Sequence, residues 1–393
     1  MKTSGSSRWF LGAALALVAI AGPADAQDYK LGYVTDLSGP LAGSYTPTWQ
    51  GFELYMKALN GRGGVGDRKV KLFLDDDGLR ADRAVASVKK QTERDGVLGI
   101  FGLSLSSTQA AVIAEMTKAG VPVVSTFSAI FDALPPANRY YFSTGVLFEV
   151  AGEAIAELSR QITPKGKVVG MTFDSVGGRA ALRHNKAIAE SLGYAWDEVV
   201  FPVRTSDFSP FAQSVAAMKP DIVVGHYGAE QNLGVIPALR QAGYDGPYVI
   251  ASYGASEETA KAAAERAGSG KNIYLVSRYA PPTEDVPGMK AVKAAAKQYG
   301  VDHPTIMHVT GWVLAKFAAE ALAKCGANCT RESLDKTMQT LSVETEGLSG
   351  GSIQMSGQDH YGPTYWRLYR WDNDRLVGVG EWLKKLGLKS SVK

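Results

Sequence analysis

Short apolar runs alternate with amphipathic helical patterns along most of the chain. Runs rich in β-branched and aromatic residues, which suit buried strands, occur at 30–35, 70–75, 98–103, 122–126 and 140–143. A second series follows at 167–173, 198–202, 221–225, 248–252 and 272–276. Helical patterns separate these runs at 48–59, 80–95, 108–119, 148–161, 178–192, 210–218 and 232–242. This alternation, completed twice, predicts an α/β protein with two Rossmann-like, doubly wound lobes.

The last third of the chain has a different pattern. Helical patterns occupy 284–299, 305–324 and 331–341, a glycine-rich turn follows at 347–351, and two tail strands are predicted at 365–371 and 376–382. A chain that ends in this way can return to the first lobe and then to the second. The two lobes would then be joined by three crossovers that form a hinge.

The first 26 residues have the pattern of a secretory signal peptide. Lys2 and Arg8 precede a short apolar stretch at 10–22, and Ala24-Asp25-Ala26 fits a small-x-small cleavage site. The apolar stretch is shorter than a membrane-spanning helix, which argues against the alternative of an N-terminal anchor. The mature chain is therefore expected to begin at Gln27 and to be soluble.

Composition excludes several classes of function. Hydrophobic residues make up 45% and charged residues 21% of the chain, as in ordinary globular proteins. The 42 basic and 39 acidic residues leave a formal charge of only +3. This small and scattered excess gives no reason to expect a nucleic-acid partner.

Two cysteines, Cys325 and Cys329, stand close together near the end of a predicted helix. In an oxidising compartment such a pair is expected to form a disulfide that closes a short loop. Half of a zinc site is the rival interpretation, but no second Cys or His pair has matching spacing. We therefore predict a disulfide and no metal site.

The motifs that look catalytic lack the context that catalysis requires. Residues 61–66 match G-x-G-x-x-G, but a helix precedes them and a strand follows, the reverse of a dinucleotide site. Ser333-x-x-Lys336 lacks its companion motifs, and 102–106 lacks the last glycine of a nucleophile elbow. Asp75-Asp76-Asp77 has no recognisable loop of further oxygen ligands. The sequence thus predicts neither an enzyme nor a cofactor.

Hydroxyl and aromatic residues gather where strands of the predicted sheets end. Serine and threonine are frequent at 104–108 and 125–128, at the carboxyl edge where open α/β sheets bind ligands. Hydroxyls and helix N-terminal N–H groups can hold a carboxylate. Their alternative role is helix capping. Aromatic residues stand at the same edges, where they could form the walls of a binding pocket or pack in the core. They are Tyr45, Trp49, Phe127, Tyr227 and Tyr253.

Several segments together resemble one family. They are Leu37-Ser38-Gly39-Pro40, Trp49-Gln50-Gly51, Asn60 to Val70, 97–110, 121–125, 207–210 and 219–224. In combination they are similar to the type I periplasmic binding proteins, within the branched-chain amino acid (leucine/isoleucine/valine) class of ABC-transporter solute receptors. The resemblance implies a periplasmic receptor without a cofactor, which closes on a small molecule and is recognised by ABC permease subunits in the inner membrane.

The resemblance also implies a division of the chain. Crossovers are expected near 143–146, 276–280 and 348–352. The first lobe would comprise 27–145 with 280–349, and the second 146–279 with 350–393. A ligand that contacts both lobes would favour the closed state.

Departures from the amino acid receptors bear on the ligand. The serine that holds an α-carboxylate in those receptors corresponds to Leu105 here, between Ser104 and Ser106. Their acidic partner of the ligand ammonium corresponds to Tyr253, and a turn tyrosine corresponds to Val176. An ammonium without an acidic partner is costly in a closed cleft. The changes argue against an α-amino acid, unless Glu230 or Glu257 replaces the missing acid.

These differences favour an aromatic carboxylate as the ligand. Ser104, Ser106 and Ser128 would hold the acid group, and the aromatic residues would enclose the ring. His226 and His308 could reach ring hydroxyls or be packed in the core. Alternatives are an amino acid or amide ligand, or a sensing receptor with a membrane signalling partner. The candidate ligand-binding residues are Tyr45, Ser104, Leu105, Ser106, Phe127, Ser128, Ala129, Val176, Tyr227, Tyr253 and His308.

Overall fold

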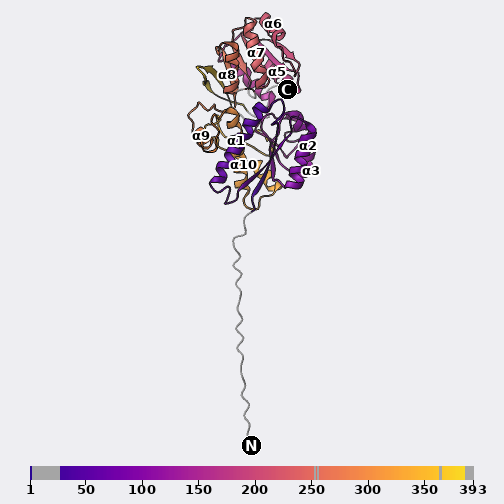
Figure 1. Cartoon of the computed structure of the whole chain (residues 1–393). Helices are drawn as coiled ribbons and strands as arrows, with labels where there is room; N and C mark the ends of the chain where they lie inside the picture. Colours follow the sequence, from indigo (N-terminus) through magenta and orange to yellow (C-terminus); the bar gives the residue numbers. More distant parts are fainter. Residues whose placement is uncertain (2–26, 252–253, 255, 363–364, 386–393) are drawn as a thin grey trace.

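The chain folds into two lobes that lie end to end (Figure 1). The computed structural model describes residues 1, 27–251, 254, 256–362 and 365–385. The predicted signal peptide and Tyr253 therefore lie outside the described residues. Each lobe is built on a parallel sheet with helices packed against it, which confirms the predicted two-lobed α/β class.

The first sheet has five parallel strands in the order β2-β1-β3-β4-β5. Its strands are β1 (Tyr29–Thr35), β2 (Val70–Asp76), β3 (Gly99–Gly102), β4 (Val123–Ser125) and β5 (Tyr141–Ser143). Helices α1 (Ala42–Gly61), α2 (Ala81–Lys89) and α3 (Ser106–Ala119) connect them, and a π-helical turn at Lys90–Asp95 continues α2. The strand order reverses between β1 and β3, so a crevice opens at their carboxyl ends.

The second sheet repeats this topology. Five parallel strands in the order β10-β9-β8-β6-β7 are extended at the β10 edge by an antiparallel hairpin. They are β6 (Lys167–Phe173), β7 (Ala195–Phe201), β8 (Ile222–His226), β9 (Tyr248–Ile250), β10 (Ile273–Ser277), β13 (Tyr365–Asp372) and β14 (Arg375–Lys384). The helices are α4 (Phe148–Ser159), α5 (Val176–Ser191), α6 (Ser209–Ala217), α7 (Ala229–Gln241) and α8 (Glu257–Ala267).

The chain passes between the lobes three times. It leaves the first sheet after β5, and it leaves the parallel part of the second sheet after β10. Helices α9 (Pro287–Tyr299), α10 (Ile306–Cys325) and α11 (Arg331–Met338) then complete the core around the first sheet. A small antiparallel pair, β11 (Ser342–Val343) and β12 (Ile353–Gln354), precedes the return to the tail hairpin.

The predicted elements are found in the structure with shifted ends. Helix α1 begins at Ala42, ahead of the expected 48, and includes Pro47. Strand β7 begins at Ala195, before the expected 198, and α9 begins later than expected, at Pro287. Helix α8 was not predicted at all, although Ser256 caps it and two acidic residues stand in its first turn. The existence and type of these elements were thus easier to predict than their ends.

Helices α1 and α10 cross at two glycines. A methyl group on Gly51 would lie 2.0 Å from the backbone oxygen of His308. One on Gly311 would lie 1.8 Å from the backbone oxygen of Thr48. Most of α10 is buried, so α10, the single described helix long and apolar enough to cross a membrane, is a core helix here. The absence of side chains at both positions allows the two backbones to touch.

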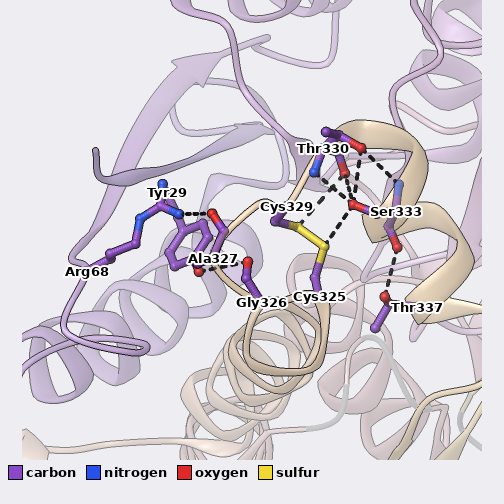
Figure 2. Close-up of a disulfide and its surroundings, with 9 residues drawn as sticks. All are labelled: Tyr29, Arg68, Cys325, Gly326, Ala327, Cys329, Thr330, Ser333 and Thr337. Atoms are coloured by element: carbon purple, nitrogen blue, oxygen red, sulfur yellow. Dashed lines mark hydrogen bonds between the residues drawn. A yellow bond between two sulfur atoms is a disulfide. The ribbon is translucent and has the colours of Figure 1, made fainter. Parts of the chain in front are cut away.

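Cys325 and Cys329 form a disulfide between the end of α10 and the start of α11 (Figure 2). The Ser333 hydroxyl lies 3.2 Å from the sulfur of Cys325. In the loop that the bridge closes, the carbonyl of Gly326 accepts a hydrogen bond from the Tyr29 hydroxyl at 3.0 Å. The disulfide thus fixes a loop that is tied to the first strand of the first sheet.

Replacing both cysteines by serine is expected to lower the free energy of unfolding by about 2 kcal/mol. The bridge spans a sequence separation of 4, and so short a loop loses little chain entropy on closure. Urea denaturation of the oxidised protein and the double variant measures the difference. A reductant should lower the unfolding free energy of the wild type to that of the variant, and it should leave the unfolding free energy of the variant unchanged. Equal stability without reductant would contradict the prediction.

Candidate functional site

A cavity of about 400 Å³ lies between the lobes, where the carboxyl ends of the two sheets face each other. Its hydroxyl residues are Ser44, Ser106, Ser107, Ser128 and Ser175. Its larger apolar and aromatic residues are Leu41, Tyr45, Leu105, Phe127, Ile130, Phe148 and Phe173, and Ala110, Gly177 and Gly228 complete the lining. Among the described residues that line it, none carries a formal charge. This size is typical of a small-molecule site.

Helix N-termini surround the cavity. Lining residues Leu41, Leu105, Ser175 and Gly228 are the N-caps of α1, α3, α5 and α7, and Phe148 is the first residue of α4. The first N–H groups of a helix lack intrahelical acceptors, and they carry the positive end of the helix dipole. At α7 the Glu230 carboxylate accepts its own backbone N–H, and at α1 the Asp36 carboxylate accepts the N–H of Leu41 at 3.0 Å, whereas α3 has no side-chain cap at Leu105. The N-terminus of α3 is therefore the part of the cavity that favours an anionic group.

An aromatic pair forms one wall of the cavity. The rings of Tyr45, from the first turn of α1, and Phe127, from the loop after β4, have centroids 3.8 Å apart at an angle of 35°. Both side chains are buried. Phe148 and Phe173 line the cavity from the second lobe, so aromatic carbon reaches it from both lobes. Such a lining suits a flat apolar group.

Five of the eleven predicted ligand-binding residues line the cavity. They are Tyr45, Leu105, Ser106, Phe127 and Ser128. All five belong to the first lobe, where short loops lead directly from strand ends to helices. Four others, Ser104, Ala129, Tyr227 and His308, lie elsewhere for reasons that differ from residue to residue, and the remaining two are treated after them.

Ser104 does not line the cavity as proposed. Its hydroxyl lies 2.9 and 3.0 Å from the two carboxylate oxygens of Asp77 and donates to them. Ser104 is fully buried beneath the cavity wall, and burial raises the pKa of the Asp77 carboxyl. The hydroxyl of Ser104 is thus committed to the protein and is not available to a ligand.

Tyr227 is a core residue, so its expected role as a cavity wall is wrong. Its side chain is fully buried, its ring packs 5.3 Å from that of Phe201, and its hydroxyl is hydrogen-bonded to that of Tyr248. The next residue, Gly228, faces the cavity instead. The side chain at the end of β8 therefore points into the sheet–helix core, and the following backbone reaches the site.

The two candidate histidines are also structural. The Nδ1 atom of His308 accepts a hydrogen bond from the backbone N–H of Thr305 at 3.1 Å, which completes a capping box at the start of α10. Burial lowers the pKa of His308 to about 4. His226 is fully buried, and burial lowers its pKa to about 3. Neither residue lines the cavity.

The remaining candidates do not contribute described side chains to the cavity. The backbone N–H of Ala129 donates to the carbonyl of Val146 at 2.7 Å, which ties the loop after β4 to the first crossover. Val176 is the first residue of α5, and its neighbours Ser175 and Gly177 line the cavity. Tyr253 lies outside the described residues. The role expected for Tyr253 stays a prediction.

Glu230 and Glu257 were the alternative partners of a ligand ammonium, and neither lines the cavity. Burial raises the pKa of Glu230, which lies in the first turn of α7. Glu257 begins α8 in the second lobe, and one of its carboxylate oxygens accepts the N–H of Ile306 across the lobes at 3.4 Å. Its other oxygen is buried, and burial raises the pKa of Glu257 to about 7. This carboxyl therefore joins the lobes at the start of α10.

Glu257→Gln is expected to stabilise the protein only at high pH. The pKa of Glu257 is about 7 in the folded state, against an ordinary value of 4.5. The favourable effect of its protonated carboxyl on folding stability is therefore complete below about pH 4.5 and is lost as the pH rises through 7. At pH 8 the variant should exceed the wild type by about 1–3 kcal/mol in unfolding free energy, and at pH 4.5 the two should agree. Urea denaturation at both pH values measures this. Glu265→Gln, at an exposed position of the same helix, is the control, and equal shifts in both variants would contradict the prediction.

Ten lining residues are not among the eleven candidates, although Ser107 belongs to the hydroxyl-rich segment 104–108. From the first lobe these are Leu41, Ser44, Ser107, Ala110 and Ile130, and from the second Phe148, Phe173, Ser175, Gly177 and Gly228. Most of them lie at or beside the first turn of a helix that follows a strand. The rule that ligands bind at carboxyl ends of strands could have found these positions if it had been applied to the first helical residues of every connection.

Comparison with known proteins agrees with this architecture. The periplasmic binding protein family matches residues 28–375, so the chain belongs to that family. The chain is 25% identical over 323 residues to the Leu/Ile/Val-binding protein homolog 7 of Brucella abortus, across 79% of this chain and 80% of the relative. The chain is thus a periplasmic binding protein, and the members of this family are solute-binding receptors and not enzymes.

Solved structures share the fold at low identity. A fatty acid ABC transporter substrate-binding protein from Thermomonospora curvata superposes with a TM-score of 0.79 at 23% identity, over 92% of this chain and 94% of that one. A second similar structure is a solute-binding protein of an ABC transporter from Rhodopseudomonas palustris BisB5, in complex with 3,4-dihydroxybenzoic acid. It superposes with a TM-score of 0.79 at 20% identity, over 92% of this chain and 99% of that one. Proteins of this family bind small molecules and work with ABC permeases.

Proposed function

We propose that the protein captures an aromatic monocarboxylate and delivers it to an ABC importer. The observation that carries this proposal is an uncharged, largely aromatic cavity onto which several helix N-termini open. The N–H groups and serine hydroxyls can hold one carboxylate, while the aromatic residues enclose a ring. The relative from Rhodopseudomonas palustris, whose structure contains a dihydroxybenzoic acid, supports the same class of ligand.

The lining argues against a zwitterionic amino acid. An ammonium removed from water needs a carboxylate or several carbonyl acceptors, or its burial costs several kcal/mol. The described lining residues offer no acidic side chain, and Glu257 is already committed to the start of α10. A long fatty acid is also disfavoured, because the cavity is compact, at about 400 Å³.

Delivery follows from the position of the cavity between the lobes. A ligand held there contacts Ser106 and Phe127 of the first lobe and Phe173 and Gly228 of the second. Those contacts exist together only when the cleft is closed, so the ligand stabilises the closed state by its differential affinity. A permease that recognises the closed form would then select the loaded receptor.

A ligand panel tests the proposal on protein stripped of bound ligand by unfolding and refolding. Benzoate, hydroxybenzoates and cinnamate are compared with leucine, valine, phenylalanine and octanoate by thermal shift, and the dissociation constants by calorimetry. A ligand at 100 times its dissociation constant adds about 2.7 kcal/mol to the unfolding free energy. We expect stabilisation by the aromatic acids alone. Tighter binding of an amino acid or of octanoate than of every aromatic acid would overturn the proposal.

A further inference from the structure

A buried glutamine lies directly behind the cavity wall. Gln109 is the fourth residue of α3, has no exposed surface and is not itself a lining residue. Its Nε2 atom is 2.8 Å from the carbonyl oxygen of Ser104, 3.0 Å from that of Ser128 and 3.1 Å from the Oγ of Ser128. Gln109 therefore connects the loop after β3 with the loop after β4, the two loops that line the first-lobe side of the cavity.

The hydrogen bonds fix which end of the amide faces Ser128. The Tyr141 hydroxyl accepts the N–H of Ile130 at 3.1 Å and donates its own proton to the Oε1 of Gln109. The carbonyls of Ser104 and Ser128 can only accept, so the NH₂ group must face them. The amide is thus held from both ends, and its donor side is directed at Ser128.

This orientation determines what the Ser128 hydroxyl can do. A hydroxyl has one proton to donate, and the Ser128 oxygen already accepts from Gln109. Among the described residues no acceptor is hydrogen-bonded to the proton of Ser128, and Ser128 lines the cavity. We infer that Gln109 is a positioning residue, which keeps the Ser128 hydroxyl a donor to the anionic group of the ligand. The inference rests on the proposed carboxylate function and deepens it.

The second lobe contains a matched arrangement without this consequence. Asn232 is the fourth residue of α7 and is also fully buried. Its Nδ2 atom donates to the carbonyl of Gly228 at 2.7 Å, and its Oδ1 accepts from the Tyr248 hydroxyl at 2.8 Å. The partners of this amide are a carbonyl and a core tyrosine, whereas Gln109 also contacts a lining hydroxyl. Asn232 therefore provides an internal control for the loss of a buried amide.

A double-mutant cycle tests the inference, with benzoate as the probe and calorimetry as the measurement. Gln109→Met removes the amide at nearly constant volume, and Ser128→Ala removes the hydroxyl. We expect Gln109→Met to weaken benzoate binding about tenfold in the wild type and less than twofold in Ser128→Ala. Gln109→Glu keeps the acceptor for Tyr141 but replaces the donor by a second acceptor, so it should weaken binding by about thirtyfold or more. The Glu variant is the second route if the Met variant fails to fold.

The outcomes separate this inference from the proposed function. Equal losses from Gln109→Met with and without the Ser128 hydroxyl, or no loss from either Gln109 variant, would overturn it. Asn232→Ala should have the same effect on benzoate affinity in both backgrounds, because its amide does not act through Ser128. Failure of the wild type to bind any aromatic acid would instead refute the proposed function.

Discussion

Ser106→Asp is expected to weaken benzoate binding by at least about 100-fold without destabilising the protein. Ser106 is the first residue of α3 and lines the cavity. A carboxylate there would compete with the ligand for the same N–H groups. At a separation of about 5 Å and an effective dielectric constant of about 20, two like charges repel by about 3 kcal/mol, or more than 100-fold in affinity.

The same substitution should be neutral or favourable for the fold. An acidic residue in the first turn of a helix stabilises it by about 0.3–1 kcal/mol. The melting temperature of the unliganded variant should therefore equal or exceed that of the wild type. Ser106→Asn is the matched control, because asparagine has nearly the size of aspartate and no charge. It should weaken benzoate binding by less than about tenfold. Similar losses in the Asp and Asn variants would show that Ser106 does not face the anionic group.

Gly311→Ala is expected to lower the free energy of unfolding by about 2–4 kcal/mol. Its methyl group would stand 1.8 Å from the backbone oxygen of Thr48 and 2.7 Å from the backbone nitrogen of Phe52. Neither atom can rotate away, so α1 and α10 must separate along their contact, with the loss of buried packing. The higher helix propensity of alanine returns only about 1 kcal/mol. Urea denaturation monitored by circular dichroism gives the difference.

Gly43→Ala in α1 is the control for this prediction. A methyl group at Gly43 would meet a single atom within 4 Å, a carboxylate oxygen of Glu230 at 3.2 Å, and that side chain can move. Its unfolding free energy should therefore stay within about 1 kcal/mol of the wild type. A Gly311→Ala protein as stable as Gly43→Ala would mean that the two helices do not touch as described.

The fold could be predicted because its strands are buried apolar runs, even where they are short, and amphipathic helical patterns separate them. β6 is expected at 167–173 and is Lys167–Phe173, since Val168, Val169 and Met171 form a buried apolar run that turn residues bound. Helix α8 is not predicted because it is rich in alanine and charged residues, so no large apolar side chains distinguish the face that packs on the core. Packing against the second sheet, through residues such as Ala260 and Ala263, determines that helix.

The site could be predicted only in part, because a strand end specifies a loop and not the direction of each side chain. Ser104 and Ser106 are two residues apart, yet one hydroxyl binds Asp77 and the other lines the cavity. Tyr227 and Gly228 exchange the expected roles in the same way. Second-lobe residues such as Phe148 and Phe173 share the cavity with first-lobe residues through the arrangement of the two lobes, which no local pattern of the sequence encodes.

The late position of α10 in the chain affects how the newly made protein folds. The first sheet is complete at Ser143, but Phe317 and Leu322, which cover its core, are synthesised after the whole parallel part of the second sheet. Until then the N-terminal third must leave apolar surface uncovered, and a chain in that state cannot gain full stability. The order of segments thus postpones tight folding until nearly all of the chain has been made.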